Sequence, residues 1–340
     1  MTLEPTPERL REYLRGFSQL TIAVWGVLVA DEFITGEIAR VSREAPVLIL
    51  KRRTRTLAPG GGANAAVNLA ALGVRVKLVG MVGRDEPGRG LLEIFRGHGI
   101  DVSGVLTLPE RLTPTKTRIL AHHAHTVPQQ VVRVDQEPAG LAEGEAASLE
   151  RRLNRLALEA ARGAAALLIS DYGYGAVTPA GAAGVRRQLK RPALTTVDAR
   201  FQIAAYRGMT AATPNESELE AALGVAIQGS VPRLEAAGRK LRRRLEAGQL
   251  LVTRGSDGMA LFERGRPTRY LPVHGSRQAL DVTGAGDTVI AAFTAALAAG
   301  ASGPDAAALA NCAGGLVVMK PGTATVTARE LDADLADYHP

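Results

Sequence analysis

The sequence has little cysteine and few aromatic residues. Cys312 is the single cysteine, which excludes a disulfide within the chain and any cysteine-based zinc site. Its Ala-rich surroundings favour the role of a small buried hydrophobic residue. Aromatic residues make up only 4% of the chain, so the core must be mainly aliphatic. The hydrophobic share of 46% and the 340 residues suit one large α/β domain or two small ones.

The sequence also lacks long apolar segments. No run of about 18 apolar residues occurs, so no membrane span is expected. The first residues, MTLEPTPERLREYL, include acidic side chains and lack the apolar centre of a secretory signal. A cytoplasmic protein is therefore expected.

The formal charge is +7, yet the pattern of a nucleic-acid-binding surface is missing. Basic residues are dispersed, and the densest group, at 239–244, is typical of a solvated helix face. Aromatic residues do not interleave with basic ones, as they do on single-strand-binding surfaces. No nucleic-acid partner is expected, and a phosphorylated, anionic substrate suits a basic surface equally well.

The most informative stretch is DVTGAGDT at 281–288, which leads into the apolar run VIAAFTAALAA. The glycines allow a tight turn that presents several N–H groups at one point. The apolar run predicts a buried helix, so this turn would lie at a helix N-terminus, which favours an anion. Asp287 could then act as a base toward a hydroxyl in phosphoryl transfer. A glycine-rich helix cap with an ordinary capping Asp is the alternative interpretation.

Most of the chain alternates strands and helices. Residues 21–29 form a continuous apolar run typical of a central parallel strand, and Asp31 follows at the end where ligands bind in open α/β sheets. Further strands are expected at 76–81, 165–170, 194–197, 210–213, 249–252, 259–263 and 268–273, and helices at 8–20, 64–73, 88–97, 141–162, 179–189, 219–223, 287–300 and 304–318. The pattern predicts an N-terminal helical extension at 1–20, then one α/β domain at 21–340 with a mostly parallel sheet covered on both faces.

Two segments, near 32–58 and 104–136, interrupt this alternation, and we interpret them as one small β lid. A polar stretch at 32–44 leads to a strand at 46–51, which alternating charges continue to 56, as in an edge or lid strand. Lys116 and Arg118 share one face of a short strand, and Arg133 projects from the next. These cations could clamp a phosphorylated substrate. A solvated edge is the alternative.

Glycines and histidines raise two further questions. Three glycines at 60–62 precede Asn64, and they would let the backbone approach a ligand. A hydroxyl-rich ligand would suit Asn64 and Asp31, whereas the alternative is that the glycines serve only helix–strand packing. His122, His123 and His125 lack a carboxylate at ligand spacing, so no metal site is expected there.

The order of these segments resembles the ribokinase-like (PfkB) family of sugar kinases from about residue 20 to 332. The resemblance rests on PGGGANAAVNLAALG at 59–73, PNESE at 214–218 and DVTGAGDT at 281–288. Softer segments, SREAPV at 42–47, TKTR at 115–118 and SDY at 170–172, are most similar to D-glycero-β-D-manno-heptose 7-phosphate kinases. The resemblance implies a three-layer ribokinase-like sandwich with a small β lid.

The resemblance also implies roles for matched positions. Asp287 would be the catalytic base, ionised at an unperturbed pKa of about 4, and the amides of Gly284, Ala285 and Gly286 would form an anion hole. Sugar hydroxyls would be held by Asp31, Gly61 and Asn64. ATP would contact Asn215, Thr253, Gly255, Gly258 and Asn311. Mg²⁺ would be organised by Asn215 and Glu218, and K⁺ by Asp281 and Thr283. A homodimer through the lid strands is implied as well.

The expected function is ATP-dependent phosphorylation of a sugar hydroxyl, foremost the anomeric hydroxyl of a heptose 7-phosphate. No G-x-x-x-x-G-K-[ST] or H-R-D segment occurs, which argues against a P-loop or protein-kinase mechanism. Val27, Tyr174 and Asp198-Ala199-Arg200 differ from the heptose kinases, and a changed phosphate grip or a different sugar would explain them. The alternatives are a kinase for another sugar or a nucleoside, and a catalytically silent sugar or nucleotide sensor.

Overall fold

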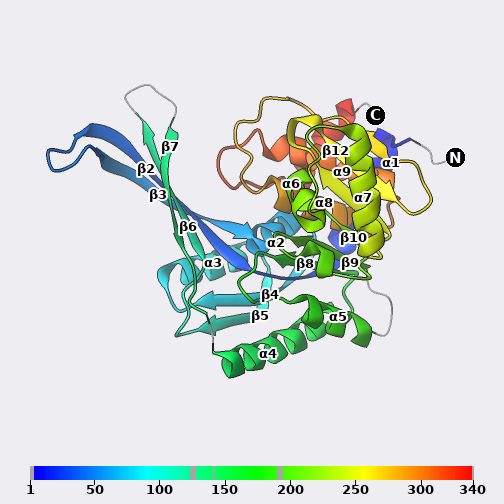
Figure 1. Ribbon diagram of the computed structural model, residues 1–340, viewed down its shortest axis with the longest axis horizontal. Helices are drawn as coiled ribbons and strands as arrows, with labels where there is room; N and C mark the ends of the chain where they lie inside the picture. Colours follow the sequence, from blue (N-terminus) through cyan, green and yellow to red (C-terminus); the bar gives the residue numbers. More distant parts are fainter. Residues whose placement is uncertain (1–3, 123–127, 141, 190–193, 339–340) are drawn as a thin grey trace.

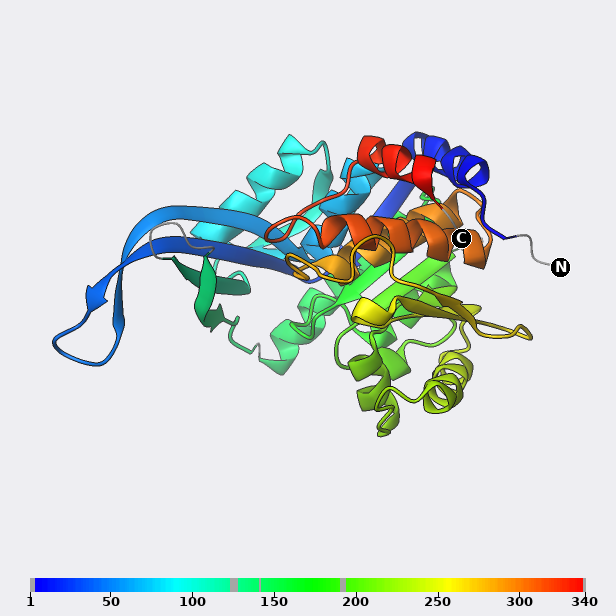
Figure 2. The same cartoon turned by 90° about the horizontal axis from the view of Figure 1, so that it is seen from above.

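Two sheets of different character organise the chain. The computed structural model describes residues 4–122, 128–140, 142–189 and 194–338. A nine-stranded sheet lies at the centre of a layered body, and a four-stranded sheet projects from it as an arm (Figures 1 and 2).

The main sheet has the strand order β13-β12-β11-β10-β9-β8-β1-β4-β5. In chain order its strands are β1 (Thr21–Gly26), β4 (Arg75–Gly83), β5 (Asp101–Leu108), β8 (Ala166–Asp171), β9 (Leu194–Ala199), β10 (Ala211–Ala212), β11 (Gln249–Thr253), β12 (Met259–Glu263) and β13 (Arg269–Leu271). The strands from β11 to β5 pair in parallel, while β12 and β13 form an antiparallel edge. The predicted mostly parallel sheet is confirmed.

Helices cover both faces of this sheet (Figure 1). One face packs against α1 (Pro7–Gly16), α2 (Gly62–Ala71), α3 (Glu86–Gly97), α8 (Ala285–Ala298), α9 (Gly303–Val317) and α10 (Ala328–Asp334), and the other against α4 (Glu143–Ala161), α5 (Pro179–Gln188), α6 (Glu216–Leu223) and α7 (Val231–Arg244). Short 3₁₀ turns are η1 (Phe17–Gln19), η2 (Ile203–Ala205), η3 (Gly255–Asp257) and η4 (Leu335–Asp337). Successive residues of a strand point to opposite faces, so Val24 enters one core and Trp25 the other.

The second sheet is the lid. Its strands are β2 (Leu28–Val41), β3 (Leu48–Gly61), β6 (Thr115–His122) and β7 (Gln129–Gln136), in the order β3-β2-β6-β7. Every residue of β7 is exposed. The lid therefore has little core of its own, and it depends on the body for its position.

Several boundaries predicted from the sequence are wrong. The expected central strand at 21–29 breaks at Val27, and the chain enters the lid as β2, so Asp31 lies inside a lid strand. Most of the polar stretch at 32–44 is strand, and register shifts at Thr35/Gly36 and Ile38/Arg40 interrupt the alternation that would have revealed it. Residues 101–108 form β5 of the main sheet and do not belong to the lid.

The N-terminal helix packs into the body and does not stand apart as an extension. Leu10, Leu14 and Phe17 are buried in the core cluster that includes α9 and α10. Arg9 forms an ion pair with Asp305 in the first turn of α9, at 2.6 Å. The division at residue 20 separates segments of sequence, and the two segments share one core.

The basic group at 239–244 lies on α7, whose Leu234, Ala237 and Leu241 face the core. The arginines at 243 and 244 are exposed, as the prediction of a solvated helix face requires. Within the part of the chain that the structure describes, no helix has the length and apolar character to cross a membrane.

Candidate active site

The DVTGAGDT stretch leads into α8, and its last four residues, 285–288, form the first turn of the helix. Gly284 is the residue before the helix and has φ +78°, a conformation that favours glycine. A Cβ at Gly284 would lie 2.4 Å from Nδ2 of Asn64, whereas a Cβ at Gly286 would meet open space. The first N–H groups of a helix have no partner within it, so this turn can receive an anion.

Asp287 lies in the same turn and is 3% exposed. Its Oδ1 accepts a hydrogen bond from the Tyr172 hydroxyl at 3.1 Å, and its Oδ2 accepts one from Asn64 Nδ2 at 3.1 Å. Burial raises the pKa of Asp287 to about 7, although both hydrogen bonds act in the opposite direction. The expectation of an unperturbed pKa near 4 is therefore wrong, because burial is a property of the fold.

Two asparagines of α2 hold the turn in place. Asn64 is fully buried, and its Nδ2 also donates to the carbonyl of Gly284 at 3.2 Å. Asn68 donates to Oδ1 of Asn64 at 2.9 Å and accepts from Thr288 Oγ1 at 3.1 Å. The Asn64 amide, predicted to hold a sugar hydroxyl, thus contacts the carboxylate of Asp287.

The lid brings further charged groups to Asp287. Asp31 is 5% exposed and accepts a hydrogen bond from Arg118 at 2.5 Å. Lys116, the neighbour of Asp31 in the β2–β6 pairing, has its Nζ 5.5 Å from the centre of the Tyr172 ring. Both Asp31 and Lys116 influence the pKa of Asp287, so the lid face and the α8 turn belong to one site.

The glycine that ends β3 allows this close packing. Gly61 has φ +58°, and a Cβ there would lie 3.1 Å from the Tyr172 ring. The predicted sugar-binding residue Gly61 therefore lies against Tyr172, which in turn contacts Asp287.

One face of the lid gathers positive charge. In the β6–β7 pairing Arg118 is opposite Arg133, and residues directly opposite share a face. Arg133 is exposed and pairs with Asp135 at 2.8 Å. Burial lowers the pKa of Lys116, and the charge of Arg200 at the end of β9 adds to this effect.

A cavity of about 350 Å³ adjoins the N-terminus of α8. It is lined by the predicted nucleotide residues Thr253, Gly255, Gly258 and Asn311 and by the anion-hole residues Ala285 and Gly286. Apolar side chains such as Met259, Val282 and Val289 complete the wall. The structure thus brings the predicted nucleotide loop and the predicted anion hole together around one space.

Asn215 and Glu218 cap the start of α6. Asn215 Oδ1 accepts from the Glu218 N–H at 2.8 Å, and a Glu218 carboxylate oxygen accepts from the Asn215 N–H at 3.0 Å. This reciprocal arrangement is a capping box, which by itself accounts for both residue types.

A third carboxylate, Asp198, lies close to Glu218 and Asp287. Asp198 as a residue is partly accessible, but its carboxylate lies deep among protein atoms. Burial raises its pKa, and the negative charges of Glu218 and Asp287 raise it further. Burial also raises the pKa of Glu218. Oxygen donors that repel one another in this way fit a divalent cation such as Mg²⁺.

Asp281 and Thr283 precede the helix. Asp281 accepts N–H hydrogen bonds from Thr283 and Gly322, each 2.9 Å long. Burial acts to raise the pKa of Asp281, but these bonds outweigh burial and lower it. The carboxylate stays charged, and the role of Asp281 and Thr283 toward K⁺ stays a prediction.

Sequence reasoning assigned no role to Tyr172, Asp198 or Arg200. Tyr172 follows β8, and the other two lie at or just after the end of β9. Ligands bind outside the carboxyl ends of parallel strands. The position of these residues at the ends of two predicted strands could therefore have marked them as site residues. His122 ends β6 in the lid, while His123 and His125 lie outside the described residues.

The sequence is similar to that of carbohydrate kinases over most of its length. A model of the pfkB family of carbohydrate kinases matches residues 26–140 and 182–329. The bifunctional protein HldE of Geobacter metallireducens is 40% identical over 339 residues, which cover 98% of this chain and 66% of that protein. HldE of Pseudomonas aeruginosa is 38% identical over 318 residues, which cover 93% and 63%. The chain thus spans just under two thirds of the length of these relatives.

Solved structures show the same fold. A ribokinase of Arabidopsis thaliana complexed with ribose and ATP has a TM-score of 0.72 at 21% identity, covering 94% of this chain and 99% of that chain. Phosphofructokinase-2 of Escherichia coli in complex with substrates and products has a TM-score of 0.73 at 20% identity, covering 93% and 98%. The ribokinase-like fold is confirmed. With the family match over most of its length, the chain belongs to the pfkB family of carbohydrate kinases.

Proposed function

We propose that this kinase transfers the γ-phosphoryl group of ATP to the anomeric hydroxyl of a heptose 7-phosphate. The observation that carries the proposal is the position of Asp287. This buried carboxylate lies in the first turn of α8, which also lines the 350 Å³ cavity, and it is influenced by Asp31 and Lys116 of the lid. The segments similar to heptose 7-phosphate kinases support the choice of sugar.

Asp287 would accept the proton of the attacking hydroxyl. A pKa of about 7 leaves part of the population ionised at neutral pH and gives the carboxylate enough basicity for proton transfer. Tyr172 and Asn64 donate to different oxygens of Asp287, so they fix the plane of the carboxylate. Such fixed geometry is what alignment of the nucleophile requires.

The α8 turn would stabilise charge on the transferred group. The amides of Gly284, Ala285 and Gly286 lie at the positive end of the helix dipole, where negative charge is favoured. Phosphoryl transfer depends mainly on such electrostatic stabilisation and on positioning. A Mg²⁺ ion held by Asp198 and Glu218, with Asn215 nearby, would offset the charge of the triphosphate.

The lid face supports a phosphorylated substrate. Lys116, Arg118 and Arg133 share this face, and Arg200 acts on Lys116 from the body. Asp31 and Asp135 are the carboxylates that pair with Arg118 and Arg133. The cations outnumber these two carboxylates, so the face would attract the phosphate of a sugar phosphate.

A second candidate is a kinase for an unphosphorylated sugar. It is favoured by the ion pairs themselves, because Arg118 and Arg133 already have carboxylate partners. Lys116 and Arg200 would then serve to balance the acidic side chains of the site.

The test is an ATP-consumption assay over heptose 7-phosphate, other sugar phosphates and unphosphorylated sugars, with Mg²⁺ present. We expect heptose 7-phosphate to have the highest kcat/KM and phosphorus NMR to place the new phosphate on the anomeric oxygen. Asp287→Asn should lower kcat by about 10²- to 10⁴-fold while ATP binding is retained. Asp101→Asn, an exposed carboxylate on the edge strand β5, is the control. Near-normal turnover by Asp287→Asn would show that the assigned base is wrong.

We also propose K⁺ dependence through Asp281 and Thr283. Replacing K⁺ by a bulky organic cation at constant ionic strength should lower kcat. Equal rates with both cations would contradict the proposal.

A further inference from the structure

Outside the kinase site, three segments that are far apart in the sequence bring a histidine, a cysteine and a carboxylate together. His274 follows β13, Cys312 lies in α9 and Asp334 ends α10. One potential ligand atom of each (ring nitrogen, thiol sulfur and carboxylate oxygen) lies within 4.8 Å of the others. Nε2 of His274 is 2.7 Å from Oδ2 of Asp334.

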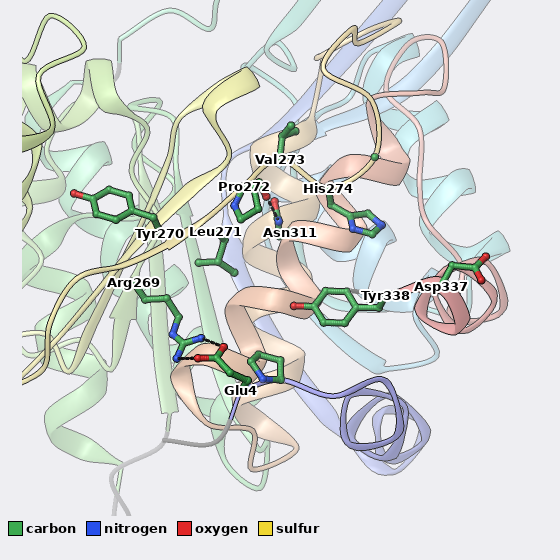
Figure 3. A pocket seen from close by; sticks show the side chains of 12 residues that line it. Glu4, Arg269, Tyr270, Leu271, Pro272, Val273, His274, Asn311, Asp337 and Tyr338 are labelled. Atoms are coloured by element: carbon green, nitrogen blue, oxygen red, sulfur yellow. Dashed lines mark hydrogen bonds and ion pairs between the residues drawn. The ribbon is translucent and has the colours of Figure 1, made fainter. Parts of the chain in front are cut away.

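The backbone around these side chains is held firmly. Asn311, next to Cys312, donates to the carbonyl of Pro272 at 2.7 Å. Gly315, one turn further along α9, packs so closely that a Cβ would lie 2.4 Å from the carbonyl oxygen of His274. The ring of Tyr338 lies near that of His274, with the ring centroids 6.3 Å apart and the planes at 27° (Figure 3). The ligand atoms therefore do not depend on a mobile loop for their approach.

The carboxylate of Asp334 is incompletely satisfied. Its Oδ2 is buried and accepts no hydrogen bond from the described residues. The contact with His274 has the length of an ion pair but lacks the direction of a hydrogen bond. A buried oxygen without a donor is unfavourable, whereas two atoms that bind the same ion lie about 3 Å apart without bonding to each other.

The position of Cys312 argues against two simpler roles. A reactive thiol must be accessible, but Cys312 is fully buried. A plain ion pair between His274 and Asp334 leaves both the thiol and the orphaned oxygen without a function.

We propose that His274, Cys312 and Asp334 bind a Zn²⁺ ion, with water as the fourth ligand. Nitrogen, sulfur and carboxylate oxygen are the ligands that zinc takes in proteins, while Mg²⁺ and Ca²⁺ prefer oxygen alone. A single cysteine therefore excludes only those zinc sites that need several cysteines. One thiolate suffices in a mixed set.

The ion would clamp the C-terminal helix α10 to the outer wall of the nucleotide cavity. Val273, beside His274, and Asn311, beside Cys312, both line that cavity. A second cavity of about 300 Å³ shares Val273 and Asn311 with the first and is also lined by His274, so it gives space for the water ligand (Figure 3).

The experiment titrates the whole chain, freed of metal by chelator, with Co²⁺ as a spectroscopic substitute for zinc. We expect one equivalent of Co²⁺ to produce thiolate-to-cobalt charge-transfer absorption in the near ultraviolet. Zn²⁺ should abolish this absorption by displacement and raise Tm by a few degrees, whereas excess Mg²⁺ should do neither.

Variants assign the ligands. Cys312→Ser should remove the charge-transfer band, and His274→Gln and Asp334→Asn should each weaken Co²⁺ binding at least tenfold. Asp332→Asn, an exposed carboxylate on the same helix, is the matched control and should bind Co²⁺ like the unaltered chain.

Failure of the unaltered chain to give the band at saturating Co²⁺ would overturn the proposal, whatever the variants do. Binding of Co²⁺ without the band would place the ion on carboxylates elsewhere, and that result would overturn it too. If Asp334→Asn and His274→Gln bound Co²⁺ with unchanged affinity and gave the same band, the site would also be contradicted.

Discussion

At the scale of single residues, burial decides the chemistry of Asp287. The carboxylate is almost inaccessible, and the loss of hydration raises its pKa to about 7. Hydrogen bonds from Tyr172 and Asn64 favour the ionised form but do not overcome burial. A base with this pKa changes its protonation near neutral pH, so both activity and stability should depend on pH there.

Activity should rise with pH as Asp287 loses its proton. We expect kcat/KM for the sugar to increase to a plateau above about pH 7, with an apparent pKa of about 7. Tyr172→Phe removes a hydrogen bond to the ionised form, so the midpoint should move to higher pH. Steady-state rates over a series of buffers measure both profiles. A midpoint near pH 4 in the unaltered enzyme would show that Asp287 is not the base.

Stability should respond in the opposite sense. Because the pKa of Asp287 in the folded state exceeds the value of 3.8 for the free group, the folded state binds this proton more tightly. The resulting stabilisation is fully present below about pH 4 and is lost as pH rises through about 7. Asp287→Asn is always neutral. At about pH 8 its free energy of unfolding should therefore exceed that of the unaltered protein by about 1–3 kcal/mol, whereas at about pH 4 the difference should be absent. Urea unfolding at both pH values measures this, and equal stability at about pH 8 would contradict the assigned pKa.

At the scale of elements, two glycines at the N-terminus of α8, Gly284 and Gly286, meet different requirements. Gly284 must adopt a positive φ and must leave room for Asn64. Gly286 has an ordinary helical position and borders the cavity of about 350 Å³. The first glycine serves the fold, and the second serves access of the ligand.

The same substitution should therefore act differently at these two glycines. Gly284→Ala should lower the free energy of unfolding by about 2 kcal/mol or more, because of the left-handed backbone and the overlap with Asn64. Gly286→Ala should leave stability within about 0.5 kcal/mol and raise KM for ATP. Thermal unfolding and ATP kinetics on both variants are the measurements. Equal destabilisation by the two substitutions would contradict the described turn.

The lid element carries the proposed preference for a phosphorylated sugar. Lys116→Met keeps the aliphatic stem and removes the charge, so KM for a sugar phosphate should rise about tenfold or more. KM for an unphosphorylated sugar should stay the same. Rates are measured at several pH values between about 7 and 9, because Lys116 lowers the pKa of Asp287 while burial lowers the pKa of Lys116 itself.

Lys51→Met, at an exposed site on the lid strand β3, is the matched control and should change neither constant. An equal rise in KM for both substrates would assign Lys116 to general electrostatics and remove the phosphate clamp.

At the scale of the whole molecule, β7 is an outer strand of the lid, and no strand of the described residues pairs with its free edge. The edge strand β7 exposes Val131, Val132 and Val134, and the lid projects beyond the body (Figure 2). An exposed edge with apolar side chains is a site for pairing with another chain. We propose that a second copy of this chain covers it.

Sedimentation should show a dimer that depends on this strand. Val132 and Val134 share the face opposite Arg133, so Val132→Lys with Val134→Lys should yield monomers without touching the cationic face. Val225→Lys, an exposed apolar site distant from the lid in the sequence, is the control. A monomeric unaltered chain at micromolar concentration would contradict the proposal.

The sequence by itself determined the alternation of strands and helices, the mostly parallel sheet and the family. It also predicted the helix that begins at the glycine-rich stretch 281–288, while Asp287 as base and the turn as an anion site stay predictions. These features depend on local patterns: apolar periodicity, glycines before a helix, and a carboxylate at fixed spacing within 281–288. Local patterns involve residues that are close in the sequence, so they can be recognised without knowing which distant segments pack together.

Only the tertiary structure decided what long-range contacts control. The pKa of Asp287 depends on burial and on charges of the lid, and the role of Tyr172 depends on a contact across 115 positions. The path of β2 into the lid leaves no regular alternation in the sequence, because register shifts interrupt its pairing with β3. His274, Cys312 and Asp334 share no local spacing at all. Three packed segments place them together, which is why a single cysteine suggested no metal until the fold was known.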